Sequence, residues 1–132
     1  MPPSDRRPLV LVVEDDEDTN SLYAEVLHYY GFDAIAVTHA ERAFALALER
    51  RPDVMAVDVG LPDVDGLQLL ARLKADARLK TIPVVCVTGY VQHHVRERAM
   101  HHGCAVFIEK PCTPQELAEA LRLAIARQRS DA

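Results

Sequence analysis

The sequence predicts an α/β fold in which a parallel sheet is covered by helices on both faces. Strand-like and helix-like segments alternate five times along the 132 residues, and this alternation is typical of a doubly wound parallel sheet. No internal repeat or low-complexity tract interrupts the pattern. We therefore expect five strands, each followed by a helix.

The first strand is the apolar run at residues 9–13. A helix is predicted from about Asp18 to Tyr30, and Gly31 is placed to end it, because glycine readily adopts the left-handed conformation of a helix end. The apolar positions of this helix recur at helical spacing: Leu22, Val26, Leu27 and Tyr30. The second strand is predicted at residues 32–37.

A capping-box pattern predicts the start of the second helix. Thr38 stands three residues before Glu41, the spacing at which the two side chains can each accept the other's backbone N–H. Apolar residues follow at helical spacing: Ala43, Phe44, Ala47 and Leu48. After this helix, Pro52 and Asp53 open the third strand.

A loop at residues 61–66 precedes the third helix, which is marked by Leu67, Leu70 and Leu73. The fourth strand is predicted from Ile82 to Thr88. The fourth helix follows from about residue 91 to 102, with Gly103 closing it, and the fifth strand covers residues 105–109.

The last helix has the strongest start signal in the chain. Thr113 is the predicted N-cap, Pro114 takes the first helical position, and Glu116 completes a capping box. The apolar face of this helix is then expected at Leu117, Ala120, Leu121, Ala124 and Ile125.

Length and composition fit one domain with its own core. An apolar fraction of 49% in 132 residues is enough without disulfides or structural metal. We predict a single domain over residues 1–132, with a core at about 9–127 and frayed tails at 1–7 and 129–132. No apolar stretch approaches the roughly 18 residues of a membrane span, and no signal peptide precedes the first strand. A cytoplasmic location without membrane association is expected.

Charge and cysteine content argue against several other classes of protein. Lys and Arg number 15 against 20 Asp and Glu, for a net charge of -5, and no basic run is present, so direct nucleic-acid binding is not expected. The three cysteines, Cys86, Cys104 and Cys112, are odd in number and lack CxxC spacing. They are interpreted as core or incidental residues.

Polar side chains end four of the predicted strands. Glu14 and Asp15 follow the first strand, Asp58 ends the third, Thr88 the fourth, and Lys110 follows the fifth. Because the carboxyl ends of parallel strands meet at one edge, these groups should lie together where open α/β sheets bind ligands. Three carboxylates against one ammonium favour a divalent cation with oxygen ligands. Taken singly, each acid also fits a solvated turn, so the argument depends on their coincidence.

This pattern resembles the receiver domains of two-component response regulators, typified by the single-domain chemotaxis regulator. The resemblance extends from about residue 9 to 127. It rests on the acidic pair at 14–15, the segment 58–66, and the tripeptides at 87–89 and 109–111. It implies a flavodoxin-like fold with strand order 2-1-3-4-5, in which strands one and three are neighbours.

The resemblance implies that Asp58 is a phosphoacceptor. It would take a phosphoryl group from the phosphohistidine of a histidine kinase or histidine phosphotransfer protein. Mg²⁺, or Mn²⁺ in its place, would bind the carboxylates of Asp15 and Asp58 and the backbone carbonyl of Gly60, while Glu14 holds a metal-bound water.

The same resemblance assigns the phosphoryl contacts and the switch. Lys110 and Thr88 would contact phosphoryl oxygens. Thr88 and Phe107 would form a switch pair that alters the face made by the fourth helix, fifth strand and fifth helix. The peptide bond before Pro111 is a candidate for the cis isomer.

Three positions depart from common family residues or tune the lifetime of the acyl phosphate. Phe107 lacks the hydroxyl of the commoner Tyr. By the same resemblance, Gly60 and Tyr90 occupy positions that control the access of water to the acyl phosphate. Gly60 leaves space for water, while the Tyr90 side chain could cover the acyl phosphate.

Histidines gather on the predicted fourth helix. His94, Arg98 and His101 share one face, but no two histidines stand four residues apart on it, so a metal site is not predicted. We interpret this as a solvated, weakly basic face whose charge varies near neutral pH. By resemblance it belongs to the surface that receivers use for downstream protein targets or for phosphorylation-dependent homodimers.

The sequence is therefore interpreted as a phosphoaccepting receiver in two-component or phosphorelay signalling. It would be a switch rather than an enzyme, with self-phosphorylation from small phosphodonors and autodephosphorylation as its accompanying chemistry. A stand-alone regulator, a phosphorelay intermediate and the excised receiver of a hybrid kinase all fit.

Two alternatives remain open. One is a phosphorylation-independent interaction module, although the usual mark of such a module, loss of an acid, Thr or Lys, is absent. The other is an aspartyl-phosphate phosphohydrolase. That class places a second Asp two residues after its nucleophile, where this chain has Gly60.

Overall fold

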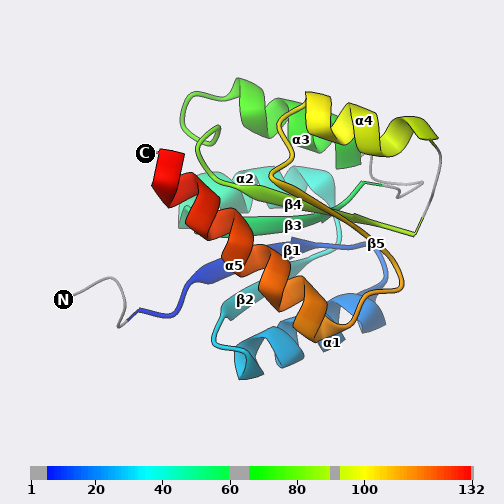
Figure 1. The fold of residues 1–132 in the computed structure, drawn as a ribbon. Helices are drawn as coiled ribbons and strands as arrows, with labels where there is room; N and C mark the ends of the chain where they lie inside the picture. The colour runs from blue at the N-terminus through cyan, green and yellow to red at the C-terminus, as the bar shows by residue number, and fades with distance from the viewer. Residues whose placement is uncertain (1–5, 60–65, 90–92, 132) are drawn as a thin grey trace.

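The computed structural model describes residues 6–59, 66–89 and 93–131. Five parallel strands form one sheet in the order β2-β1-β3-β4-β5, and helices cover both of its faces (Figure 1), which confirms the predicted fold. The strands are β1 (Leu9–Val13), β2 (Asp33–Val37), β3 (Val54–Asp58), β4 (Val84–Thr88) and β5 (Val106–Glu109). The helices are α1 (Glu17–Tyr29), α2 (Ala40–Arg50), α3 (Gly66–Ala75), α4 (His93–His101) and α5 (Pro114–Asp131).

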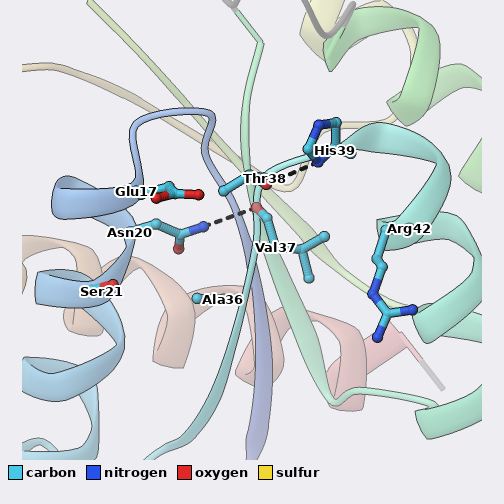
Figure 2. A pocket seen from close by; sticks show the side chains of 8 residues that line it. All are labelled: Glu17, Asn20, Ser21, Ala36, Val37, Thr38, His39 and Arg42. Carbon is cyan, nitrogen blue, oxygen red and sulfur yellow. Dashed lines mark hydrogen bonds between the residues drawn. The ribbon is translucent and has the colours of Figure 1, made fainter.

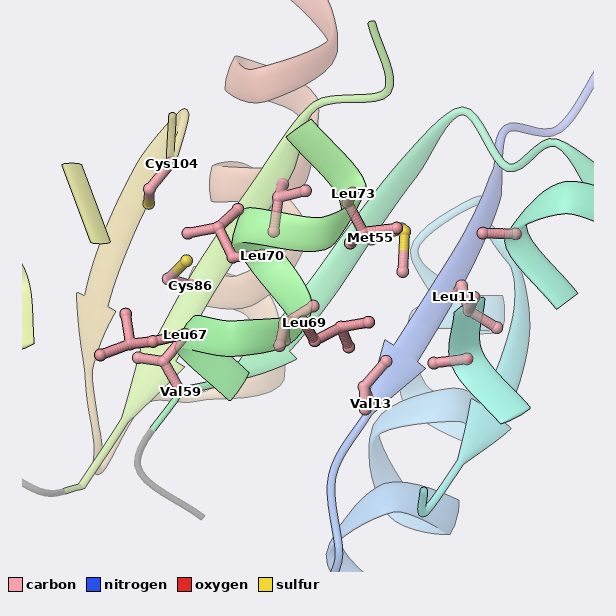
Figure 3. Packing of buried hydrophobic residues seen from close by; sticks show 14 of the residues in the cluster. Leu11, Val13, Met55, Val59, Leu67, Leu69, Leu70, Leu73, Cys86 and Cys104 are labelled. Atoms are coloured by element: carbon pink, nitrogen blue, oxygen red, sulfur yellow. The ribbon is translucent and has the colours of Figure 1, made fainter. Parts of the chain in front are cut away.

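Each face of the sheet has its own hydrophobic core. On one face, α2, α3 and α4 pack on the sheet through residues that include Ala43 and Ala99. Leu70 and Leu73 of α3 belong to the same core (Figure 3). On the other face, α1 and α5 pack through residues that include Leu27, Leu117 and Leu121. Because side chains on both faces are buried, β3 and β4 are buried at every position. Only the strand ends are therefore open to polar chemistry.

The buried face of α1 differs from the predicted one. It consists of Asn20, Tyr23 and Leu27, whereas Leu22 is 53% exposed. Leu27 is buried as predicted, and Tyr30 packs against the same core. Asn20 was left out of the predicted apolar face because it is polar, although it has the helical spacing of Tyr23 and Leu27. The end of α1 is as predicted, since Gly31 has a φ of +99° and its N–H donates to the carbonyl of His28.

The two predicted capping boxes have opposite outcomes. At α5, Thr113 Oγ1 accepts the N–H of Glu116 at 3.0 Å, and Glu116 Oε1 accepts the N–H of Thr113 at 3.0 Å, which confirms the box. At α2 the prediction is wrong. His39 is extended there and is the N-cap, without a side-chain cap bond. The helix thus begins one residue later than the box requires, and Thr38 Oγ1 pairs with His39 Nδ1 instead.

Two further boundaries differ from the prediction. β4 begins at Val84 rather than Ile82, directly after Pro83, because proline has no N–H to donate to the sheet. The helix α5 continues to Asp131, through residues 129–131 that were expected to fray. Its last turns are supported by the packing of Ile125, which is 8% exposed. Residues 1–5 lie outside the described residues.

The cysteines are free, as predicted. Cys86 and Cys104 are buried and Cys112 is half-buried. Within the described ranges, none of the helices is long and apolar enough to cross a membrane.

Candidate functional site

The carboxyl edge of the sheet brings together residues that are far apart in the sequence. The register that pairs Val13 of β1 with Val57 of β3 carries Glu14 and Asp58 side by side at the next position. From the other side, the N–H of Lys110 donates to the carbonyl of Thr88 at 2.8 Å, which fixes the chain after β5 beside the end of β4.

Lys110 joins the two acids. Its Nζ lies 2.6 Å from Glu14 Oε2 and 2.8 Å from Asp58 Oδ2. Glu14 is 5% exposed and Asp58 6%, so the ion pairs are shielded from water on the side of the acids. One ammonium thus serves two buried carboxylates, and the cluster keeps excess negative charge.

The pKa values of this cluster respond to burial and pairing together. Burial raises the pKa of Glu14, aided by the charge of Asp58 and opposed by the hydrogen bond from Lys110, and the net direction is upward. Burial alone would lower the pKa of Lys110, but its hydrogen bonds to Asp58 and Glu14 and their charges raise the pKa above its ordinary value. Lys110 therefore keeps its positive charge at neutral pH.

The other predicted site residues have different environments. Asp15 is half-buried next to Glu14, and Thr88 is buried at 1% exposed. Phe107 is half-buried, pairs with Cys86 in the sheet register and packs against the core under α3 and α4. The Lys110–Pro111 peptide bond is cis. Gly60 and Tyr90 lie outside the described residues.

The acidic run after β1 divides into two parts. Glu14 belongs to the lysine-bridged cluster, whereas Asp16 is the N-cap of α1 and accepts the N–H of Thr19 at 3.2 Å. The hydrogen bonds from Thr19 lower the pKa of Asp16. Glu17 and Asp18 are exposed in the first helical turn, so the solvated-turn interpretation holds for the second part of the run.

A metal would have to use donors that are not gathered into a ready-made cluster. In the part of the chain that the structure describes, no group of three or more His, Cys, Asp or Glu side chains could hold a metal ion. The donors nearest the edge are nevertheless all oxygens, from Glu14, Asp15 and Asp58, and they exceed the charge of Lys110. This donor set fits Mg²⁺, which binds through one or two carboxylates and keeps several waters.

Asn20 is a positioning residue that the sequence prediction missed. Its Nδ2 donates to the carbonyl of Val37 at 2.8 Å (Figure 2). The same Nδ2 donates to the carbonyl of Glu14 at 3.2 Å. It thereby ties the backbone of Glu14 to the end of β2. The signal that could have found it is a polar residue on the same helical stripe as Tyr23 and Leu27.

Gly66 is the second missed residue. A Cβ at this first residue of α3 would lie 2.3 Å from the backbone oxygen of Asp58 and 2.5 Å from the Cα of Val59. The helix therefore starts directly against the backbone that carries Asp58, and only glycine permits this approach.

The polar face predicted on α4 is present. His94, Arg98 and His101 are all exposed. They form part of the surface made by α4, β5 and α5.

We predict that Glu14→Gln stabilises the protein in buffer without Mg²⁺. A raised folded-state pKa means that folding favours the protonated acid; this stability is present below the ordinary glutamate pKa of 4.5 and is lost as the pH rises through the folded-state pKa. Glutamine mimics the protonated form. Denaturant unfolding at neutral pH should show a gain of about 1 kcal/mol, which shrinks in acid.

The matched control is Glu116→Gln, the same change at an exposed acid whose pKa is lowered by its bonds to Thr113. That variant should not gain stability. A Glu14→Gln gain that is absent, or that is as large at pH 4 as at pH 7, contradicts the raised pKa of Glu14 on which this prediction rests.

The fold and this edge together define a class: small flavodoxin-like α/β domains with paired acids and a lysine at the switch point of the sheet. Residues 10–122 match the model of the response regulator receiver domain. The chain therefore belongs to the response regulator receiver family. Members of this family are signalling switches of two-component systems rather than typical enzymes.

Individual proteins agree with this assignment. The polar-differentiation response regulator DivK of Brucella anthropi is 34% identical over 113 residues, which cover 86% of this chain and 92% of the relative. A sensor protein from Polaromonas is similar in structure with a TM-score of 0.82, 30% identity, and coverage of 93% of this chain and 99% of that one. A CheY-like receiver from Methanospirillum hungatei has a TM-score of 0.87 at 21% identity, with 96% and 100% coverage, and supports the fold.

Proposed function

We propose that the whole chain is one receiver domain whose phosphoacceptor is Asp58. The observation that carries this proposal is the Lys110 ammonium, 2.8 Å from Asp58 Oδ2 at the end of β3. In the proposed step an Asp58 carboxylate oxygen forms a bond to phosphorus, and the bond from phosphorus to the imidazole nitrogen of a phosphohistidine breaks. The donor would be a histidine kinase or a histidine phosphotransfer protein.

The residues of the edge would prepare and then hold the phosphoryl group. Lys110 already balances part of the carboxylate charge of Glu14 and Asp58. Once the acyl phosphate forms, its ammonium would contact a phosphoryl oxygen. Thr88 would donate its hydroxyl to another phosphoryl oxygen. Asn20, by holding the backbone of Glu14, keeps the acid on the far side of Lys110 in place.

Magnesium would be held by Asp15, Asp58 and the backbone carbonyl of Gly60, with Glu14 on a metal-bound water. When bound, it would neutralise negative charge on the carboxylates and on the transferring oxygens. Mn²⁺ could take its place.

The test is transfer from acetyl phosphate followed by intact-mass analysis. We expect one phosphoryl group per chain in the presence of Mg²⁺ or Mn²⁺ and none after chelation. If the chain stays unlabelled with Mg²⁺ present and a histidine phosphotransfer protein also fails as a donor, a phosphorylation-independent interaction module becomes the better interpretation.

The output surface is proposed to be the face of α4, β5 and α5. Thr88, at the end of β4, and Phe107, at the middle of β5, would link the site to this face. The ring of Phe107 is half-buried, so part of its surface can still be removed from water. Burial of about 40 Å² more of this apolar surface would contribute about 1 kcal/mol. A bias of this size shifts a two-state equilibrium about fivefold, so the unphosphorylated protein should already sample the active-like state.

Thr88→Ala should still accept phosphate at Asp58 but should respond less on α4 and β5. Loss of the hydroxyl removes the donor that draws the end of β4 toward the phosphoryl group. The measurement is amide NMR of wild type and variant, with and without beryllofluoride, a mimic of the phosphoryl group. Equal shifts over residues 93–109 in both proteins would show that Thr88 does not couple the site to this face.

A further inference from the structure

The opposite edge of the sheet holds a basic hollow that the phosphorylation chemistry does not use. It lies where β1 and β2 begin and α2 ends, on the left in Figure 1, and has a volume of about 650 Å³. Four guanidinium groups and two carboxylates line it: Arg6, Arg7, Arg50, Arg51, Asp33 and Asp53. A small adjoining hollow shares Arg6, Arg7 and Asp53 and adds Arg129.

The two carboxylates of the hollow are already engaged. Asp33 forms an ion pair in which its Oδ1 lies 3.3 Å from the Nε of Arg7. Asp53 accepts the backbone N–H of Leu9 on its Oδ2 at 2.7 Å. Arg51 donates to the carbonyl of Arg78 and lies near Asp76, a carboxylate that already pairs with Arg78. In the described parts of the chain, residues 6–59, 66–89 and 93–131, the guanidinium groups of Arg6 and Arg50 have no salt-bridge or hydrogen-bond partner.

This charge stands out in a chain whose net charge is -5. The guanidiniums of the hollow exceed its carboxylates by two, so an occupant should carry at least two negative charges. Guanidinium groups match phosphate oxygens through paired N–H donors, in a geometry that lysine cannot supply. The volume falls within the roughly 300–1,000 Å³ of small-molecule sites, and half-buried Leu9, Ala34 and Ile35 supply an apolar wall.

We propose that this hollow binds a small metabolite with at least two linked phosphoryl groups. Arg50 and Arg51 hold the phosphates, with Arg6 closing the site from the N-terminal side. Asp53 repels an extended polyanion, which favours a compact ligand over a nucleic-acid backbone. The site is separate from Asp58 and goes beyond the proposed phosphoacceptor function.

The test is isothermal titration calorimetry with inorganic tripolyphosphate and pyrophosphate at about 150 mM salt, without Mg²⁺. We expect saturable binding of one ion per chain, with orthophosphate at least tenfold weaker. The double variant Arg50→Ser with Arg51→Asn should weaken the binding of tripolyphosphate about a hundredfold. Each lost charge-assisted pair accounts for about tenfold of this loss. Asparagine is chosen at residue 51 because the backbone there has a φ of 48°.

The matched control removes two arginines from exposed positions on α4, as Arg96→Ser with Arg98→Asn. It should change the affinity less than twofold; an equal loss in both double variants would mean non-specific charge attraction and overturn the proposal. Amide NMR should place the shifts at Leu9, Ala34 and Asp53. Shifts centred on Lys110 instead would assign the binding to the phosphorylation edge and also overturn it.

Two further ligands sharpen the chemical class. If ATP binds as tightly as tripolyphosphate, or more tightly, a nucleotide-sized ligand is supported. The difference between the two affinities shows whether the apolar wall contributes to binding. A hexaglutamate peptide tests whether the ligand is an acidic protein segment instead. If it binds this hollow and tripolyphosphate does not, the phosphate assignment is wrong.

Discussion

Asp58→Asn should give a folded protein that acetyl phosphate no longer labels. Asparagine has no carboxylate oxygen to attack phosphorus, and loss of a nucleophile costs on the order of 10⁴-fold or more in rate. The fold should persist because Lys110 keeps its 2.6 Å partner in Glu14, and because the substitution removes one of two buried like charges. The measurement is intact mass over time with acetyl phosphate and Mg²⁺, accompanied by thermal unfolding of each protein.

Asp53→Asn is the control for this experiment. Asp53 lies at the opposite edge of the sheet, where it accepts the N–H of Leu9, so its loss should leave labelling within about twofold of wild type. Unchanged labelling of Asp58→Asn would place the phosphoacceptor on another residue.

The gathering of polar side chains at one edge could be predicted from the sequence because of how the sheet is buried. β3 and β4 are covered on both faces, so their sequences are apolar until the strand ends. Asp58 and Thr88 break that pattern at the same topological position. Parallel strands then bring such ends to one edge without any knowledge of long-range distances.

Contacts between side chains could not be predicted in the same way. The pattern implied that Glu14, Asp58 and Lys110 are neighbours, but not that one ammonium bridges both acids, because that depends on distances of 2.6 and 2.8 Å. Asn20 was missed for a different reason. A polar residue was assumed to face water, whereas two backbone carbonyls accept hydrogen bonds from the Nδ2 of Asn20 in the interior.

The start of α2 shows a limit of local motifs. The Thr38 and Glu41 spacing is the same as that of Thr113 and Glu116, yet only the second pair forms a box. The extended backbone of His39 decides the outcome, since it shifts the helix start by one residue. Such a shift depends on how β2 ends against its neighbours, which a four-residue pattern does not contain.

Gly66 had no local signal that distinguished it from any loop glycine. The contact that requires glycine is with the backbone of Asp58, eight residues earlier in the sequence. Glycine is required because the first residue of α3 lies against the end of β3, and not because of a positive φ angle. The same contact makes this residue the one whose substitution should disturb both the fold and the site.

Gly66→Ala should lower the free energy of unfolding by roughly 3 kcal/mol, the upper part of the range for overpacked sites. The added Cβ would lie 2.3 Å from the backbone oxygen of Asp58, and a backbone atom cannot move aside as a flexible side chain does. This cost outweighs the gain of up to about 1 kcal/mol that alanine brings to a helix relative to glycine. Denaturant unfolding measures the loss, and slower acetyl phosphate labelling should accompany it as Asp58 shifts relative to Lys110.

Gly89→Ala is the matched control, since it makes the same substitution beside the same site. Its Cβ would lie 3.6 Å from the Cβ of Lys110, an ordinary van der Waals contact. We expect a change in unfolding free energy of less than about 1 kcal/mol and labelling close to that of wild type. If Gly66→Ala were as stable as Gly89→Ala, the start of α3 would have room to move away from Asp58, and the rigid contact inferred between helix and phosphoacceptor would be wrong.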